Sequence, residues 1–441
     1  MNKIKLLMIC HFSDDKIRSH LLLKKNHKIA DYAVWITNQI NGYEKRNDIE
    51  LHIVSPHKGM QKMRQEFEIN SIHYYFFRSD PFIGQFVEKA INYLCYYISK
   101  GFINRILEEI RGIYRLIYYY PQKIYVKALV KRIKPDIIHL NGAENPYYSS
   151  TILGLKKCGI PICVLIQGIV SDPQVIKYEK GDISRIKIEK KIHSSFHYYI
   201  VGSAHHYALV KQGNPKAIFL FSPGIRTINI NVEKECVEKI YDFVFFARIN
   251  QIKGIEHLIE AISRLKNEYS EISLLILGPC SRSYQAYLMQ LCNNKGVANN
   301  ITYGGYIQKR EDFFRRALTA KIYVLPTLIE GLATSAVEAM LLGLPVITYA
   351  TGGMPFLNKD GENVLMAPTG DIDSLVLYMK KLLDDPIYAQ EIAKRGQNFA
   401  KRVFSEESNI ETRIRQYRAI IANYKEGVPI PDELIFDGTY K

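Results

Sequence analysis

The sequence predicts an α/β protein made of two doubly wound domains, and three observations lead to that prediction. Short apolar runs of strand length alternate with helix-length amphipathic segments, which is typical of a parallel sheet with helices on both faces. The length of 441 residues is too great for one ordinary core and suits two. The chain is 47% hydrophobic and 23% charged, as in a folded globular protein, and no apolar run approaches the roughly 20 residues of a membrane span.

The first half of the chain contains seven segments with the apolar pattern of a strand. We interpret the opening residues as the first strand rather than a secretory signal, because the apolar run is short and ends at His11 and two aspartates. A helical pattern follows over 29–40, and a later helix is expected to end near Lys134, before Pro135. The expected strands are Ile4–Ile9, Glu50–Val54, Ile72–Phe76, Asp136–Leu140, Ile162–Ile166, Tyr198–Val201 and Ala217–Phe221.

The second half repeats the alternation. Val232–Lys239 is charged and has no apolar period, so we place the link between the domains near 225–240. After Asp385 the chain is helical nearly to Tyr424, with a break expected near Phe404. The pattern therefore predicts domains over 1–225 and 226–404 and a closing helix over 405–425. The expected strands are Tyr241–Ala247, Ile272–Leu277, Ile301–Tyr303, Lys321–Leu325, Pro345–Tyr349 and Val364–Met366.

Cysteine usage and short motifs exclude several classes of protein. The seven cysteines are scattered without a C-x-x-C pair, which argues against disulfides and zinc and for a reducing cytoplasm. Asp371-Ile372-Asp373 has the form of a metal site, but it precedes a helix, so we interpret the aspartates as an N-cap and first-turn charge. We expect no metal and no other cofactor. The phosphate-binding G-x-x-x-x-G-K-[ST] motif is absent, as is G-x-G-x-x-G after the first strand, which weakens NTPase and dinucleotide functions.

The net charge of +15 lies in the first half. Residues 1–225 hold 33 Lys and Arg against 18 Asp and Glu, whereas residues 226–441 hold 26 of each. Within 81–134, apolar and aromatic residues recur at helical spacing, and nine cations lie between Lys100 and Lys134. These helices either lie on an anionic membrane surface or present an ordinary solvated face over a core stripe. The charge asymmetry and the tyrosines at 118–120 favour the membrane surface.

The stretch Lys321–Gly353 places two carboxylates beside a strand end. A buried strand ends at Pro326, and a glycine turn and a helix follow. Ligands in open α/β sheets bind at the carboxyl ends of strands. Glu330 in the turn can accept hydrogen bonds from hydroxyl groups, or it is a solvated loop residue. Glu338 on the helix is either a ligand-binding residue or part of a Ser335-x-x-Glu338 capping box.

Other strand ends carry cations and glycines. Arg248 and Lys253 follow the strand that begins at Tyr241 and open a helix whose amide end attracts anions, an arrangement that suits a diphosphate. Taken alone, such cations are more often solvated in a surface turn. Gly278 and Gly304 follow neighbouring strands and allow the backbone to approach a ligand closely.

Together these residues resemble the donor domain of the family 4 glycosyltransferases. The resemblance is specific over about residues 241–370 and looser elsewhere. It rests on Arg248…Lys253-Gly254, Pro326…Glu330-Gly331…Glu338-Ala339-Met340…Gly343…Pro345-Val346-Ile347 and Gly352-Gly353. Enzymes of that family have the GT-B fold, in which two Rossmann-like domains face each other across a cleft, and they retain the anomeric configuration without a metal.

The resemblance implies a role for each matching residue. Arg248 and Lys253 would bind the donor diphosphate, helped by the backbone after Gly331, at Leu332 and Ala333. Glu330 would hold hydroxyls of the transferred sugar and act with the two cations in catalysis. Glu338 would hold the ribose of the nucleotide, and the closing helix would cross back to the first domain.

The sequence also departs from the family pattern. Many members have E-G-F-G where this chain has Glu330-Gly331-Leu332-Ala333, and many have a glutamate at the position of Phe356. Residues 11–31 contain no glycine, although a glycine pair is usual in that loop. A strand that often ends in His-Gly ends here in Gln167-Gly168. On the acceptor side the candidates are therefore Gln167, which can donate to a hydroxyl or phosphate, and His139.

These features predict a retaining glycosyltransferase. It would move a sugar from a nucleotide-diphosphate sugar to a glycan or lipid-linked acceptor in cell-surface polysaccharide or lipopolysaccharide biosynthesis. We expect it in the cytoplasm, as a peripheral protein on the inner face of the membrane. The alternatives are a GT-B nucleotide-sugar epimerase and a basic nucleic-acid-binding protein. The second ranks lower, because the tyrosines have helical core spacing rather than the exposed interleaving that stacks bases.

Overall fold

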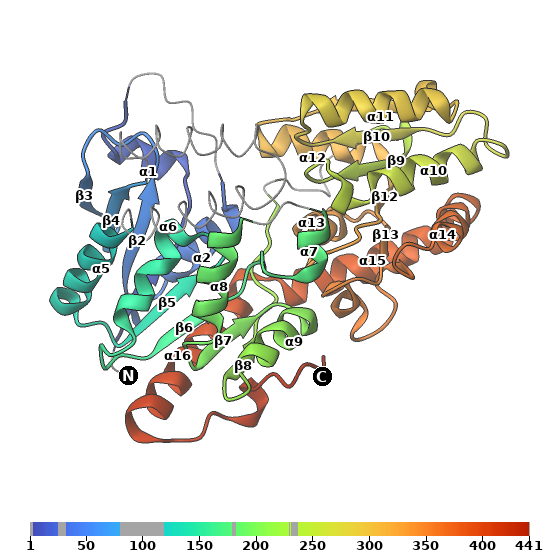
Figure 1. Cartoon of the computed structure of the whole chain (residues 1–441). Coiled ribbons are helices and arrows are strands. Elements are labelled where there is room, and N and C mark those ends of the chain that lie inside the picture. The colour runs from blue at the N-terminus through green and yellow to red at the C-terminus, as the bar shows by residue number, and fades with distance from the viewer. Residues whose placement is uncertain are drawn as a thin grey trace, which may run out of the picture. The chain divides into compact units, whose positions relative to one another are not determined.

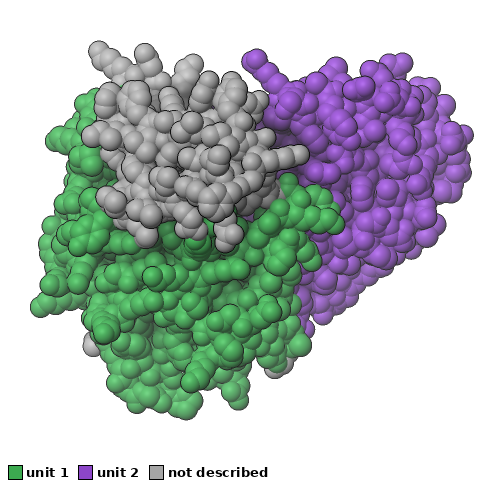
Figure 2. Space-filling view, in the orientation of Figure 1, with its two compact units in different colours: residues 1–222, 409–439 green, residues 223–408, 440–441 purple. Residues whose placement is uncertain are grey.

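The chain divides into two compact units in the computed structural model, which describes residues 3–24, 32–79, 119–178, 182–228, 230 and 237–440. Unit 1 contains residues 1–222 and 409–439, and unit 2 contains residues 223–408 and 440–441 (Figure 2). The expected linker near 225–240 lies partly outside the described residues. Of the expected basic helices over 81–134, residues 81–118 lie outside the described residues.

Unit 1 is built on an eight-stranded sheet in the order β3-β4-β2-β1-β5-β6-β7-β8 (Figure 1). All its pairings are parallel except that of β3 with β4. The edge strand β3 was not expected, because it lacks the apolar run of a buried strand: its side chains alternate between exposed and half-buried. The strands are β1 (Ile4–Ile9), β2 (Ile49–His57), β3 (Arg64–Ile69), β4 (Ile72–Arg78), β5 (Ile137–Asn141), β6 (Ile162–Leu165), β7 (Tyr198–Val201) and β8 (Ile218–Phe221).

Helices cover the unit 1 sheet, and one of them comes from the far end of the chain. They are α1 (Asp15–His20), α2 (Val34–Glu44), α5 (Tyr120–Ile133), α6 (Pro146–Ser149), η1 (Ser150–Leu155), α7 (Pro173–Tyr178), α8 (Ile183–His193), α9 (Ala204–Gly213), α16 (Glu406–Glu426) and η6 (Asp432–Leu434). The buried hydroxyl of Tyr417 on α16 lies 2.9 Å from that of Tyr43 on α2. Gln416 donates to the carbonyl of Phe221 at 2.8 Å. Helix α16 is therefore part of the unit 1 core.

Unit 2 is built on a six-stranded sheet, fully parallel, in the order β11-β10-β9-β12-β13-β14. Its helices pack on both faces, α10 against α14 and α13 against α15. The strands are β9 (Tyr241–Phe246), β10 (Leu274–Leu277), β11 (Ile301–Gly305), β12 (Ala320–Leu325), β13 (Val346–Tyr349) and β14 (Leu365–Ala367). The helices are η3 (Gln251–Lys253), α10 (Ile255–Leu265), α11 (Arg282–Asn294), η4 (Ala298–Asn300), α12 (Arg310–Leu318), α13 (Thr334–Leu341), η5 (Met354–Asn358), α14 (Ile372–Asp384) and α15 (Pro386–Val403).

Several local predictions are confirmed. Asp371 caps α14 by accepting a hydrogen bond from the Ser374 N–H at 3.1 Å. The expected break near Phe404 separates α15 from α16. Helix α5 ends at Ile133, and Lys134 takes a left-handed conformation before Pro135. Helix α2 begins at Val34, later than the pattern over 29–40, whose residues 29–31 lie outside the described part.

The two sheets share the strand order of the GT-B fold. Counted in chain order, the parallel strands run 3-2-1-4-5-6-7 in unit 1 and 3-2-1-4-5-6 in unit 2. In each sheet the order reverses between two adjacent strands, β1 and β5 in unit 1 and β9 and β12 in unit 2. Ligands of doubly wound sheets bind outside the carboxyl ends of the strands at such a switch point. No helix in the described residues combines the length and apolar character needed to cross a bilayer.

Candidate functional site

Two turns meet at the switch point of unit 2. One follows β9 and contains Arg248 and Lys253, and the other follows β12 and contains Glu330. The Leu328 N–H donates to the carbonyl of Ile252 at 2.8 Å, which fastens the turns together. Lys253 and Glu330, which are 77 positions apart in the sequence, therefore lie side by side.

Glycines allow this close approach of the turns. Gly254 has φ 70°, and a Cβ atom there would lie 1.8 Å from the carbonyl oxygen of Pro326. Gly352, with φ 55°, would place a Cβ 1.6 Å from the carbonyl oxygen of Glu330. Gly278, with φ 137°, would place one 1.9 Å from the carbonyl oxygen of Ala247. These distances are far inside van der Waals contact, so a side chain at any of the three positions would push the turns apart.

Lys253 and Glu330 form an ion pair between the two turns. The side chain of Lys253 is 22% exposed and that of Glu330 is 16% exposed. Asn250 caps the short helix η3 at Lys253, accepting from its N–H at 3.3 Å, and so positions the start of that side chain. The solvated-loop interpretation of Glu330 is wrong, because its carboxylate is mostly covered and paired.

Arg248 lies at the exposed end of β9. Within the described parts of the chain its guanidinium has no hydrogen-bond or ion-pair partner. An exposed guanidinium without a protein partner beside a paired lysine is available to an anion.

Glu338 is buried on α13, and its carboxylate pairs with Arg310 at the start of α12. The capping-box prediction is wrong, because α13 begins at Thr334 with Ala333 as its N-cap and has no side-chain cap. Ser335 therefore lies inside the first turn. Burial raises the pKa of Glu338, and the nearby cations Arg310 and Arg226 oppose that shift.

Arg226 and Arg310 are charged neighbours of Glu338 that the sequence did not reveal. The Nε atom of Arg226 is buried without a hydrogen-bond partner among the described residues. Burial lowers its pKa, against the opposing charges of Glu338 and Glu330. Arg310 follows β11 as Arg248 follows β9. A cation a few residues after a strand end was therefore the sequence signal that could have identified Arg310. Arg226 follows β8 in the same way, but the sequence placed it in the link between the two domains.

The remaining predicted residues of unit 2 lie in neighbouring turns. Gly304 lies within β11, where a Cβ atom would lie 2.5 Å from Leu277 Cδ2. Gly331 and Leu332 are half-buried between β12 and α13. Ala333 is buried, and its N–H points at the Met354 sulfur at 3.5 Å. The Leu332-Ala333 departure is thus accommodated by packing of this turn against η5.

The two unit 1 candidates have different surroundings. Gln167 follows β6 and is half-buried, and its Nε2 is a buried donor without a partner in the described chain. His139 lies inside β5, fully buried, and its Nδ1 is hydrogen-bonded to Tyr417. Burial lowers the pKa of His139 well below its usual range. The structure therefore makes His139 a neutral core residue beneath α16 rather than a strand-end group.

At the unit 1 switch point the structure adds His11 and Glu144, which follow β1 and β5. The hydroxyl of Tyr32 lies 2.7 Å from His11 Nε2, and Tyr147 is hydrogen-bonded to Nδ1. Burial lowers the pKa of His11 to about 3. Burial also raises the pKa of Glu144 to about 7, and its Oε2 has no partner among the described residues. A carboxylate just after a strand, the signal that identified Glu330, was available for Glu144 as well.

Comparison with known proteins gives a family match in the second half of the chain. Residues 229–399 match the family described as glycosyl transferases group 1. The MMP alpha-(1->4)-mannosyltransferase of Mycolicibacterium hassiacum is 27% identical over 173 residues, which are 39% of this chain and 41% of that protein. The lipopolysaccharide core biosynthesis glycosyltransferase LpsE of Rhizobium meliloti is 28% identical over 162 residues, 36% of this chain and 45% of that protein. The chain thus spans less than half the length of these curated relatives.

Solved structures match nearly the whole chain at low identity. Sucrose-phosphate synthase from Thermosynechococcus elongatus has a TM-score of 0.67 and 16% identity, covering 95% of this chain and all of that one. HepE from Anabaena, solved in complex with UDP, has a TM-score of 0.58 and 14% identity, covering 94% of this chain and all of that one. These likenesses show a GT-B fold.

Proposed function

We propose that the chain is a retaining glycosyltransferase using a nucleotide-diphosphate sugar, because residues 229–399 match the family described as glycosyl transferases group 1. The observation that supports the proposal is the switch point of unit 2, where Lys253 pairs with Glu330 and the exposed Arg248 follows the end of β9. The UDP and UDP-glucose complexes of HepE support a nucleotide-sugar donor.

In the proposed mechanism, Arg248 and Lys253 bind the donor diphosphate. Charge develops on this group as the sugar departs, and cations fixed in advance stabilise that charge at little reorganisation cost. The ion pair with Glu330 holds the Lys253 ammonium in place before the donor arrives. Two cations and the amide end of α10 supply the positive charge, so the proposed transfer needs no metal.

Glu330 and Glu338 are proposed to recognise the donor's hydroxyl groups. Glu330 would bind those of the transferred sugar, and Glu338 those of the ribose. Arg310 orients the Glu338 carboxylate, and a carboxylate held in one position binds a diol with less loss of side-chain freedom. As the family resemblance implies, an oxygen of the leaving phosphate accepts the acceptor's proton.

The acceptor is proposed to be a glycan or lipid-linked saccharide bound at unit 1. The unpartnered Nε2 of Gln167 and Oε2 of Glu144 follow adjacent strands, β6 and β5. Both atoms lack a hydrogen bond within the described residues, and an acceptor hydroxyl would supply one. The match to LpsE supports a place in lipopolysaccharide or cell-surface polysaccharide synthesis.

A screen of UDP-, GDP- and ADP-sugars by thermal unfolding tests the donor class. We expect one nucleotide series to raise the unfolding temperature, because a ligand at 100 times its dissociation constant adds about 2.7 kcal/mol of stability. That donor should be consumed only when a saccharide acceptor is present. Turnover of the donor alone would point to the epimerase, and binding of no nucleotide sugar would contradict the proposal.

A further inference from the structure

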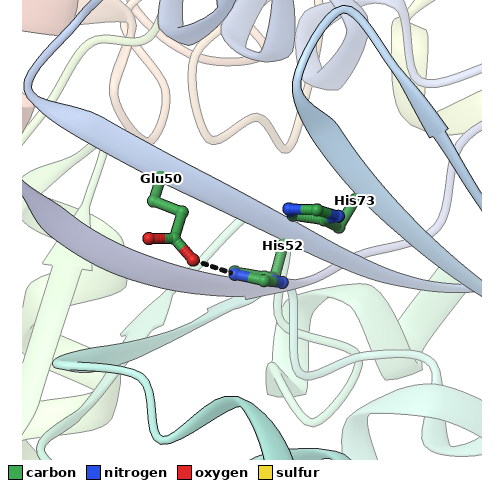
Figure 3. Close-up of side chains that lie close together, drawn as sticks. All are labelled: Glu50, His52 and His73. Atoms are coloured by element: carbon green, nitrogen blue, oxygen red, sulfur yellow. Dashed lines mark hydrogen bonds and ion pairs between the residues drawn. The ribbon is translucent and has the colours of Figure 1, made fainter.

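Three side chains that bind metals in other proteins lie close together at one end of the unit 1 sheet. Glu50 and His52 are two residues apart on β2, so they lie on one face of the sheet. His73 on β4 is the register partner of His52, and its ring lies beside that of His52 (Figure 3). One ligand atom from each residue lies within 4.8 Å of the others. A strand pair thus presents three donor groups at the corners of a small triangle.

Each imidazole is also held by a second group. The Nδ1 atom of His52 lies 3.1 Å from the hydroxyl of Tyr75, and that of His73 lies 3.2 Å from the Glu68 carboxylate. The Glu68 carboxylate only accepts, so it favours the proton on Nδ1 of His73 and leaves the Nε2 lone pair for a ligand. In His52, Nε2 now donates to Glu50, so metal binding requires that proton to shift to Nδ1, where the Tyr75 hydroxyl can accept the hydrogen bond. Metal-binding histidines usually have an outer partner of this kind.

We propose that Glu50, His52 and His73 form a binding site for a divalent transition metal ion of the zinc class. Two imidazole nitrogens and a carboxylate oxygen suit Zn²⁺, Co²⁺ or Ni²⁺, whereas Mg²⁺ and Ca²⁺ require mainly oxygen ligands. Three protein ligands leave one tetrahedral position for water. The site lies near the amino ends of β2 and β4, whereas the candidate acceptor residues follow the carboxyl ends of their strands. The inference therefore does not depend on the proposed transfer reaction.

Metal binding requires local rearrangement. His52 Nε2 is now hydrogen-bonded to Glu50 Oε1 at 2.9 Å, and the ion would replace that bond. The two rings are stacked at 15° with centroids 4.6 Å apart, so each must turn about its Cβ–Cγ bond for the lone pairs to converge. That torsion has a broad minimum, and the His73 side chain is 36% exposed. Lys5 Nζ lies 3.4 Å from Glu50 Oε1, and its positive charge repels a metal ion bound there.

The test is zinc binding by the full chain, measured by competition with a chromophoric chelator, together with the visible absorption of bound Co²⁺. We expect the wild-type chain to bind Zn²⁺ and the His73→Gln and His52→Gln variants each to bind at least about tenfold more weakly, since loss even of an outer partner costs that much. Lys5→Gln should bind more tightly, because it removes the competing charge. The exposed His197→Gln variant is the matched control and should behave as wild type.

The outcomes decide between a metal site and a simple hydrogen-bonded cluster. Zinc should raise the unfolding temperature of the wild type but not that of His73→Gln. Equal zinc affinity in the wild type and the His52→Gln/His73→Gln double variant would overturn the proposal, as would an unchanged affinity in Lys5→Gln. If His52→Gln unfolds, the partly exposed His73 and Lys5 variants decide the question by the same measurements.

Discussion

The ion pair between Lys253 and Glu330 joins two turns that are far apart in the sequence. Neither side chain alone differs from an ordinary surface residue. Once they are paired and mostly covered, the ammonium has a fixed position at the switch point, where a phosphate group would meet it. The proposed catalytic role of these residues therefore depends on their arrangement rather than on their type.

Replacing Lys253 with alanine should reduce kcat by about two to three orders of magnitude, the effect of losing one preorganised group that stabilises developing charge. Arg248→Ala should act in the same direction. Kinetics with saturating donor provide the measurement, and the exposed Lys394→Ala variant on α15 controls for loss of charge. Near-normal turnover in both site variants would rule out the phosphate assignment.

Glu338→Gln separates donor binding from helix stability. Because Glu338 caps nothing and its ion-pair partner Arg310 is 38% exposed, loss of that pair in the neutral amide should lower the unfolding temperature only slightly. The KM for the donor should rise about tenfold, as expected when a hydrogen bond to a charged group is lost. A marked loss of stability with unchanged KM would instead make Glu338 a structural residue.

Glu144 should make the stability of unit 1 depend on pH. Its pKa of about 7 in the folded chain lies above the ordinary value of 4.5, so the folded state binds more protons between these values and stability falls as pH rises through them. Glu144→Gln should match the wild type near pH 4.5 and be more stable above pH 7, by about 3 kcal/mol. Thermal unfolding at both pH values tests this, with the exposed Glu391→Gln as control. A constant difference across that pH range would contradict the raised pKa.

At the scale of elements, the strand-end turns of unit 2 form one packed layer. Its spacing requires glycines, because a Cβ atom at these positions would lie less than 2 Å from a carbonyl oxygen of a neighbouring turn. The layer holds the site residues at the carboxyl edge of the sheet, so its packing affects function as well as stability.

Gly254→Ala tests this layer against a matched control. Gly254 and Gly296 have nearly equal φ values, 70° and 68°, but only Gly254 would place a Cβ against a backbone carbonyl, since nothing lies within 4 Å at Gly296. Both alanines carry left-handed strain of about 1–2 kcal/mol. Gly254→Ala should lose additional stability and most of its activity, whereas Gly296→Ala should remain active. Equal effects on unfolding temperature and turnover would mean that the turn contact is unimportant.

At the scale of the whole molecule, the positive charge of residues 1–225 remains the basis of the predicted membrane contact. Most of the predicted basic segment lies outside the described residues, but α5 is described. Its outer face has Lys127 and Lys131 exposed together with Tyr120 and Ile124, which are 61% and 53% exposed. Cations beside exposed apolar groups are typical of helices that lie on anionic lipid.

Reversing the charge of Lys127 and Lys131 to glutamate should therefore weaken flotation with anionic vesicles, because each basic residue near such a surface contributes about 1 kcal/mol. The same change at the exposed Lys394 and Lys401 of unit 2 is the control. Unchanged flotation of the α5 variant, or no flotation of the wild type, would contradict a membrane role for this helix.

The sequence by itself determined the strands, the break before α16 and the N-cap at Asp371, because apolar periodicity, proline and capping residues act over a few neighbouring positions. It also predicted that Arg248, Lys253 and Glu330 lie at one edge of the unit 2 sheet, because parallel strands bring their carboxyl ends to that edge. The charged edge strand β3 was missed, because an edge strand pairs on one side only and β3 has no run of buried apolar side chains.

Only the tertiary structure decided what each candidate side chain contacts. It paired Glu338 with Arg310 and left the capping box, one of the two alternatives for Glu338, unformed. It brought Tyr417 onto His139, 278 residues away along the chain, and it buried the Oε2 atom of Glu144. Burial and long-range pairing depend on which elements pack together, and local sequence patterns do not contain that information.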